Sequence, residues 1–320
     1  MLGTHSGAIQ GESVGRGAPS SVLLALSDIK LAHSVFALPF ALLGAFLGAP
    51  RTPGGRIDWA PFVGMLALVV LCMVFARTWA MLYNRLVDAR FDRENPRTSG
   101  RAVASGRLSA RAGWSIALAS AACFVACASL FGVFFGNFWP AILSPLVLVW
   151  IAFYSLTKRF TWLCHVFLGG ALAASPLAAA LAVGGLDALV LPHGAPVWWI
   201  ASMVVCWVAG FDVIYALQDM EFDRGAGLSS VPARFGWRRA AWISRVLHAL
   251  AFASLVAAGL SAERLGLLYW AALVPVGLLL VYEHVVLARR GAGGLDLAFF
   301  TLNGVVSCVL GLAGCIDAAF

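Results

Sequence analysis

Long runs of apolar residues alternate with short polar segments along most of the chain. Nine runs are long enough to cross ~30 Å of hydrocarbon as helices. They lie near residues 31–49, 59–84, 111–135, 138–156, 162–183, 196–217, 240–260, 264–287 and 296–316. Only Gly136-Asn137 separates the third run from the fourth, so eight spans is the alternative count. The pattern predicts an all-α membrane protein, a bundle of about nine transmembrane helices forming a single domain over residues 29–320.

Composition supports the membrane assignment. Hydrophobic residues make up 61% of the chain and charged residues only 12%, which is far more apolar than a soluble domain of this length needs. Residues 1–28 are polar and lack the charged-then-apolar order of a cleavable signal peptide, so we expect a flexible cytoplasmic tail. All seven cysteines lie in the apolar runs, where core packing explains them.

Arginine and lysine cluster in alternate connecting segments. If the amino terminus is cytoplasmic, 18 of the 22 cationic residues lie on the cytoplasmic side, and only Arg51, Arg56 and Arg264 lie outside. The positive-inside rule therefore predicts a cytoplasmic amino terminus and an outside carboxyl terminus. The net charge of +7 is explained by this topology and needs no nucleic-acid partner.

Two acid-rich segments end the second and sixth apolar runs. They contain the pairs Asp88 and Asp92, and Asp219 and Asp223. Residues four apart lie on one face of a helix, and four carboxylates at a membrane edge require neutralising cations. Mg²⁺ commonly bridges carboxylates to a substrate phosphate. We therefore predict a metal–diphosphate site, shared by two pseudo-repeated halves around a central cavity open to the cytoplasm. Separate solvated acidic loops are the alternative.

Basic residues accompany these segments. Long basic loops are expected after each, over residues 93–110 and 224–238. Arg77 lies within the second apolar run, on the helical stripe that continues through Asn84 to the aspartates. An arginine inside a span is costly, so Arg77 is predicted to face a polar cavity and to bind a substrate carboxylate or diphosphate. A structural role, pairing with a helix carbonyl or with Asp212, is the alternative.

Several motifs together resemble the UbiA-type intramembrane aromatic prenyltransferases, over nearly all of residues 28–318. Residues 84–92 fit that family's Asn-x-x-x-Asp-x-x-x-Asp signature, and residues 95–101 continue it. Similar segments occur at His33–Pro39, at Tyr154 through Lys158-Arg159, and at Asp212 through Asp223. The chain is closest to the bacterial branch similar to 4-hydroxybenzoate polyprenyltransferase. It departs from the family at Arg85, where many members have aspartate.

The resemblance implies a role for each motif. The four aspartates would be catalytic and would hold Mg²⁺ on an allylic polyprenyl diphosphate, with Asn84 assisting. Five basic residues lie near enough in sequence to helix ends or to the aspartate segments to bind phosphate oxygens: Arg97, Arg101, Lys158, Arg159 and Arg224. The resemblance favours this role for Arg101, Lys158 and Arg159, and topology or lipid-headgroup contacts are the alternative for each. Tyr154 and Tyr215 would orient the acceptor, unless they form an interfacial aromatic belt. No role is expected for His33 or His165.

The implied activity is Mg²⁺-dependent transfer of a polyprenyl group to a hydroxylated aromatic acid, first 4-hydroxybenzoate, in respiratory quinone biosynthesis. The implied location is the bacterial inner membrane. A dihydroxynaphthoate acceptor in menaquinone biosynthesis by the futalosine route is the nearest alternative, followed by haem or chlorophyll prenylation. A CDP-alcohol phosphotransferase would need a further Gly-x-x-x-Asp-x-x-x-Asp motif after Arg90, which is missing. A cation transporter would place its acids mid-span, a position for which only Asp212 qualifies, and loosely.

Overall fold

The computed structural model describes residues 34–295 and 301–320, and this part of the chain is helical. Seven of its helices are long and apolar enough to cross a membrane. They are α3 (Trp59–Val87), α5 (Ala110–Phe135), α6 (Trp139–Thr157), α7 (Cys164–Gly184), α8 (Ala195–Tyr215), α10 (Val231–Ser261) and α11 (Leu267–Arg290). Two shorter apolar helices, α2 (Ser34–Leu47) and α12 (Asn303–Ala319), complete the bundle. The predicted tail over residues 1–28 and His33 lie outside the described residues.

Seven long helices are fewer than the nine predicted spans, because α2 and α12 fall short of spanning length in the described residues. The count of nine therefore stays a prediction. The third and fourth apolar runs do form separate helices, since Gly136 ends α5 in the left-handed region at φ 74°. This separation argues against a merged span and the count of eight.

The expected basic loop over residues 224–238 is wrong. Helix α9 (Met220–Gly225) extends into it, and α10 begins at Val231, nine residues before the predicted apolar run. Ser230 caps α10 by accepting a hydrogen bond from the Ala233 N–H, and a proline in the first turn favours the same start. A kink at Gly236, with φ 76° and ψ 171°, then redirects the helix. The Ser230 cap therefore starts the helix within a segment whose basic residues had favoured a loop.

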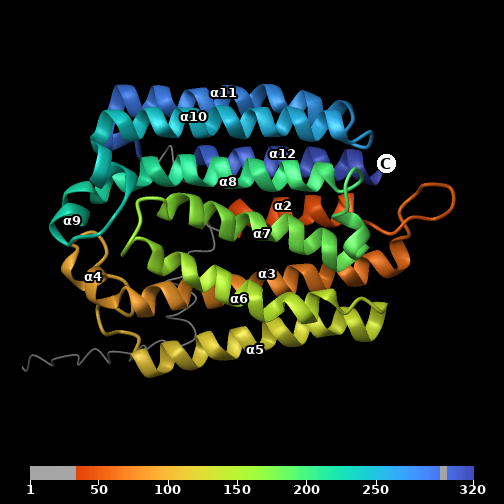
Figure 1. Ribbon diagram of the computed structural model, residues 1–320, viewed down its shortest axis with the longest axis horizontal. Coiled ribbons are helices and arrows are strands. Elements are labelled where there is room, and N and C mark those ends of the chain that lie inside the picture. The colour runs from red at the N-terminus through yellow and green to blue at the C-terminus, as the bar shows by residue number, and fades with distance from the viewer. Residues whose placement is uncertain (1–33, 296–300) are drawn as a thin grey trace, which may run out of the picture.

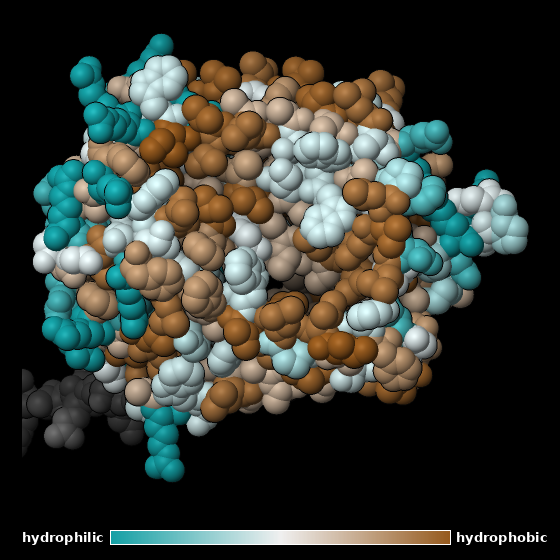
Figure 2. All heavy atoms as spheres, viewed as in Figure 1, coloured by the Kyte–Doolittle hydropathy of each residue, from teal (hydrophilic) through white to brown (hydrophobic). Residues whose placement is uncertain are grey.

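The long helices lie side by side, with α4 (Ala89–Glu94) and α9 at one end of the bundle and the carboxyl terminus at the other (Figure 1). Hydrophilic side chains gather at the two ends, and a mainly hydrophobic band lies between them (Figure 2). This distribution matches a bilayer that surrounds the middle of the helices.

Close helix crossings rely on small residues. Helix α2 meets α7 at Gly44 and Gly48, one turn apart. A Cβ atom added to Gly44 would lie 2.3 Å from the Pro176 carbonyl oxygen, and one added to Gly48 would lie 2.9 Å from the Ala180 carbonyl oxygen. Such small-x-x-x-small pairs let membrane helices approach backbone to backbone. The contact fixes α7, which forms one wall of the central cavity.

A buried polar chain links three helices away from that cavity. The Trp207 indole N–H of α8 donates to Asn303 Oδ1 of α12 over 2.7 Å, and Asn303 Nδ2 donates to Glu283 Oε1 of α11 over 3.3 Å. Glu283 is buried and was not predicted from the sequence to have a role. Such hydrogen bonds between membrane helices stabilise their association.

Gly44→Ala is expected to lower the thermal unfolding temperature of the detergent-solubilised protein. The added methyl group meets backbone that cannot rotate away, and overpacking of this kind costs about 1–3 kcal/mol. Gly304→Ala in α12 is the matched control, because nothing lies within 4 Å of the added Cβ. Equal unfolding temperatures for the two variants would contradict the close crossing.

The fold also predicts that Ser105 and Phe320 face opposite sides of the membrane. Ser105 lies in the exposed connection after α4, and Phe320 ends the chain at the other end of the bundle. Ser105→Cys in intact cells should resist a membrane-impermeant maleimide that labels Phe320→Cys. The unmodified protein controls for its native cysteines. Labelling of both positions from one side would show that the chain crosses the membrane differently.

Candidate active site

The aspartate segments share one local structure. Helix α3 ends at Val87, and Asp88 (φ −95°, ψ 6°) leads into the six-residue helix α4, which contains Asp92. In the second segment, η3 (Ala216–Asp219) follows α8, and Asp219 (φ −99°, ψ 4°) leads into the six-residue helix α9, which contains Asp223. The matching breaks support the predicted internal repeat. They correct the prediction that each pair stacks on one uninterrupted helix.

Each of the four carboxylates has its own cationic partner. The ion pairs, with their N···O distances, are Asp88–Arg159 at 3.0 Å, Asp92–Arg101 at 2.6 Å, Asp219–Arg97 at 2.5 Å and Asp223–Lys158 at 2.7 Å. Asp92, Asp219 and Asp223 are buried, so their charges depend on these partners. The structure thus brings together all four predicted aspartates and four of the five predicted phosphate-binding cations.

Arg97 joins the two halves of the repeat. Its guanidinium donates to both oxygens of Asp219, from Nε over 2.9 Å and from Nη2 over 2.5 Å. It also donates from Nη1 to the Tyr215 hydroxyl over 3.1 Å. Asn95 supports the same contact, because its Nδ2 donates to Asp219 Oδ1 over 3.0 Å. Asn95 was not among the predicted site residues, because it follows the first motif and meets the second only in the fold.

The connection between α6 and α7 contributes two further cations to the site, Lys158 and Arg159. Arg159 Nη2 donates to Asp88 Oδ1 and, over 2.7 Å, to the Val87 carbonyl at the end of α3. Lys158 reaches Asp223, whose other oxygen accepts a hydrogen bond from Ser230 over 3.0 Å. Neighbouring cations therefore contact different halves: Arg159 binds the first motif and Lys158 the second.

The direction and cause of the pKa shifts distinguish the Lys158–Asp223 pair from the Asp88–Arg159 pair. Burial lowers the pKa of the Lys158 ammonium, but nearby negative groups, first Asp223 and then Asp219, together raise it, so Lys158 stays charged. Burial also raises the pKa of the Asp88 carboxyl, and the hydrogen bond from Arg159 counters this only in part. Asp88 would therefore be stabilised by more positive charge than Arg159 supplies.

A divalent metal fits this donor set when other ligands complete it. One oxygen of Asp92, Oδ2, is buried without a hydrogen-bond partner. Asn84 Nδ2 donates to Asp88 Oδ2 over 2.9 Å, which orients that carboxylate. In the part of the chain that the structure describes, no three His, Cys, Asp or Glu side chains are grouped closely enough to hold a metal by themselves. Mg²⁺ suits such a site, because it commonly takes one or two carboxylates together with waters and phosphate oxygens.

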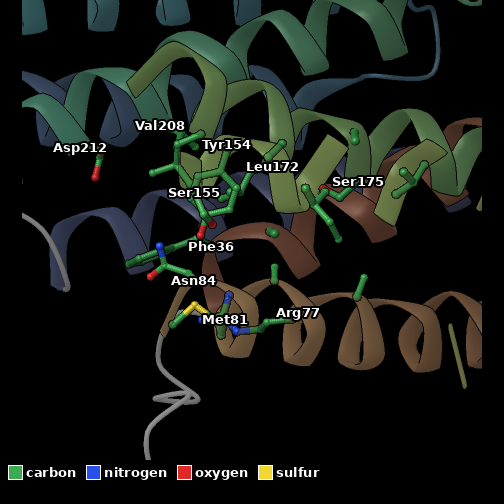
Figure 3. Close-up of a pocket in the computed structure, with 18 of the residues that line it drawn as sticks. Phe36, Arg77, Met81, Asn84, Tyr154, Ser155, Leu172, Ser175, Val208 and Asp212 are labelled. Atoms are coloured by element: carbon green, nitrogen blue, oxygen red, sulfur yellow. The ribbon is translucent and has the colours of Figure 1, made fainter. Parts of the chain in front are cut away.

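A cavity of about 670 Å³ extends from the aspartates into the bundle. Residues of α2, α3, α5, α6, α7 and α8 line it, and beyond the motifs its walls are mostly apolar, as at Val69, Leu172 and Trp198. Arg77, Tyr154 and Ser155 also line it (Figure 3). Arg77 Nε and Nη2 and the Ser155 hydroxyl are buried without hydrogen-bond partners. Unpaired donors beside a cavity favour an anionic or polar ligand.

An Asp–His pair at the cavity wall was not predicted from the sequence. His165 Nδ1 lies 2.7 Å from Asp212 Oδ2, and His165 Nε2 accepts the Val231 N–H over 3.2 Å. Because Nε2 accepts, Nδ1 holds the ring proton and donates it to Asp212. Asp212 is therefore not the partner of Arg77, as the structural alternative held. Tyr154 and Tyr215 also line the cavity, which argues against a purely interfacial role.

Arg224 is not brought into the site. Its Nη1 pairs with Glu221 over 3.0 Å and its Nε donates to the Ala233 carbonyl, so it ties α9 to α10 at the surface. It does not line the cavity. Arg85, the departure from the family motif, does line it and donates to Asn84 Oδ1 over 3.0 Å.

Comparison with known proteins shows which family the chain matches. The model of the UbiA prenyltransferase family matches residues 37–305. The 4-hydroxybenzoate octaprenyltransferase of Marinobacter nauticus is 31% identical over 265 residues, which cover 82% of this chain and 85% of that protein.

Solved structures share the fold. The apo structure of a UbiA homolog from Aeropyrum pernix K1 has a TM-score of 0.77 and 32% identity, covering 90% of this chain and 98% of that one. A UbiA homolog from Archaeoglobus fulgidus bound to GPP and Mg²⁺ has a TM-score of 0.63 at 21% identity, covering 94% of this chain and 100% of that one. The second likeness shows the fold alone.

Proposed function

Because the chain belongs to the UbiA prenyltransferase family, and is thus an integral membrane enzyme that transfers prenyl groups, we propose that it moves a polyprenyl group from an allylic diphosphate to a hydroxylated aromatic carboxylic acid. The preferred acceptor is 4-hydroxybenzoate. The observation that supports this most directly is Arg77, whose buried N–H groups lack partners beside the cavity that leads from the four aspartates.

The aspartate end of the cavity binds the diphosphate in this proposal. Asp88, Asp92, Asp219 and Asp223 hold Mg²⁺, with Asn84 orienting Asp88. Bound Mg²⁺ stabilises the negative charge that develops on the leaving diphosphate. Phosphate oxygens are also bound by Arg97, Arg101, Lys158 and Arg159, whose positions beside the carboxylates support this assignment.

The acceptor lies deeper, between α3, α6 and α8. Arg77 binds its carboxylate, and the Ser155 hydroxyl and Tyr154 orient the ring. The ring carbon beside the phenol attacks the allylic carbon as the bond to the diphosphate breaks. Asp212, held by its hydrogen bond from His165, then accepts the proton lost from that ring carbon. The apolar remainder of the cavity holds the prenyl tail and excludes water, which would otherwise capture the allylic cation.

The distribution of basic residues predicts how the protein is oriented in the membrane. The aspartate end faces the cytoplasm of a bacterial cell, in the inner membrane, with the amino terminus inside and the carboxyl terminus outside. The cationic connections around α4, α9 and the α6–α7 turn lie together at that end (Figure 1).

Product analysis by mass spectrometry tests the reaction. Purified protein with Mg²⁺, a prenyl diphosphate and a panel of aromatic acids should yield prenylated 4-hydroxybenzoate, and EDTA should abolish the product. Asp88→Ala and Asp219→Ala should each lower the rate by at least about 100-fold, since each removes a group that stabilises developing charge. Asp187→Ala, an exposed site far from the motifs, should not change it.

The acceptor panel also separates the nearest alternatives. Exclusive prenylation of a dihydroxynaphthoate would replace 4-hydroxybenzoate as the acceptor while leaving the reaction class intact. Full activity of Asp88→Ala or Asp219→Ala would refute the shared site.

Arg77→Ala should raise KM for the aromatic acid by ten- to a hundredfold, with a smaller effect on KM for the prenyl diphosphate. A charge-assisted hydrogen bond contributes about 1.5–3 kcal/mol, and ~1.4 kcal/mol corresponds to tenfold. Arg77→Lys should recover little if the carboxylate is bound bidentately. An equal rise in both KM values would instead assign Arg77 to the diphosphate site or to the scaffold.

A further inference from the structure

We propose that Arg97, Arg101, Lys158 and Arg159 are exchangeable counter-ions, so that divalent metal and diphosphate bind this site together and only weakly apart. The inference rests on the proposed function, because it concerns the same metal–diphosphate site. It arises from the one-to-one pairing of four motif aspartates with four cations.

Metal alone meets a cation at each of the four carboxylates, although Asp92 keeps one oxygen, Oδ2, without a hydrogen-bond partner. To coordinate Asp219, a metal must displace a guanidinium that already occupies both of its oxygens. To coordinate Asp223, it must compete with the Lys158 ammonium at 2.7 Å. Asp219 and Asp223 are buried, and the cations that would be displaced are only partly exposed, with side-chain exposures of 30% for Arg97 and 33% for Lys158. Separating such a pair without a replacement partner is unfavourable.

The carboxylates also fail to form a complete metal cage. No group of three acidic, histidine or cysteine side chains among the described residues can hold a metal. A metal ion bound here without diphosphate would therefore depend on water for most of its ligands, while still having to displace the cations. The geometry offers little affinity for metal by itself.

Diphosphate removes both obstacles. Its oxygens complete the coordination of the metal, and they accept hydrogen bonds from the cations that the metal displaces. Arginine suits this exchange because its planar fork binds carboxylate and phosphate in the same way. Diphosphate alone would in turn draw the cations away from the carboxylates and leave these unneutralised. Each ligand therefore strengthens the binding of the other, and by linkage the two effects are equal.

Arg97 is the most informative of the four cations. It binds Asp219 bidentately from the other half of the repeat, and Asn95 retains a separate hydrogen bond to the same carboxylate. Loss of the guanidinium thus removes the competitor while leaving Asp219 one oriented contact. Arg97→Gln should increase metal affinity in the absence of diphosphate, whereas a purely structural Arg97 would leave it unchanged or lower it.

The test is equilibrium dialysis of purified full-length protein with Mn²⁺, with and without geranyl S-thiolodiphosphate, an analogue that ionises poorly. A protein-free compartment with the same analogue corrects for metal bound in solution. For the unmodified protein, Mn²⁺ affinity should rise at least tenfold with the analogue, and analogue affinity should rise by the same factor with Mn²⁺.

Two variants test whether Arg97 is a cation that competes with the metal. Arg97→Gln should bind Mn²⁺ at least threefold more tightly than the unmodified protein when the analogue is absent, and its coupling factor should fall. Arg90→Gln is the matched control, since it removes the same charge from a neighbouring side chain that is 83% exposed and pairs with Glu94. Its Mn²⁺ affinity and coupling should not change. Size-exclusion profiles should verify that both variants fold.

Equal Mn²⁺ affinity with and without the analogue in the unmodified protein would overturn the proposal while leaving the metal site standing. Unchanged or weaker Mn²⁺ binding by Arg97→Gln without the analogue would overturn it as well, because Arg97 would then not compete with metal. Absence of Mn²⁺ binding under both conditions would overturn the proposed function itself and this inference with it.

Discussion

Neutralisation of four carboxylates at one end of an apolar bundle is the constraint on which the rest of the site depends. Each carboxylate is buried or half-buried, and each lies within 3.0 Å of a cation from a separate connecting segment or neighbouring turn. Because unpaired charges in such a place are costly, the connections after α4 and α6 must fold over the helix ends. The same charges that close the site make it suited to a metal and a diphosphate.

Helix breaks determine where those charges point. At Asp88 and at Asp219 the backbone leaves the α-helical region with nearly the same φ and ψ, and a six-residue helix follows each break. Asp92 and Asp223, the second aspartate of each pair, follow these breaks and line the cavity. Close packing of α2 against α7 at Gly44 then keeps the walls of the cavity in place. The site is thus an outcome of backbone geometry as much as of residue type.

Polar groups within the bundle fall into two kinds. Trp207, Asn303 and Glu283 hydrogen-bond to one another and join helices away from the cavity. Arg77 differs, because two of its nitrogens lack partners and it lines the cavity. A buried donor that the protein leaves unsatisfied is more informative about a ligand than one that is satisfied internally. This difference separates polar residues that hold helices together from one whose unpaired nitrogens lie beside the cavity.

The sequence alone determined the membrane class, most helix positions, the two aspartate motifs and the family, because apolar periodicity and motif spacing are local properties. Tertiary structure decided the rest. His165 and Asp212 lie 47 residues apart and Asn95 and Asp219 lie 124 apart, so only folding reveals these contacts. Closeness in sequence to the second aspartate segment grouped Arg224 with the other cations, whereas in the fold it contacts Glu221 and α10. Long-range pairing depends on which helix ends meet, and no local pattern records that.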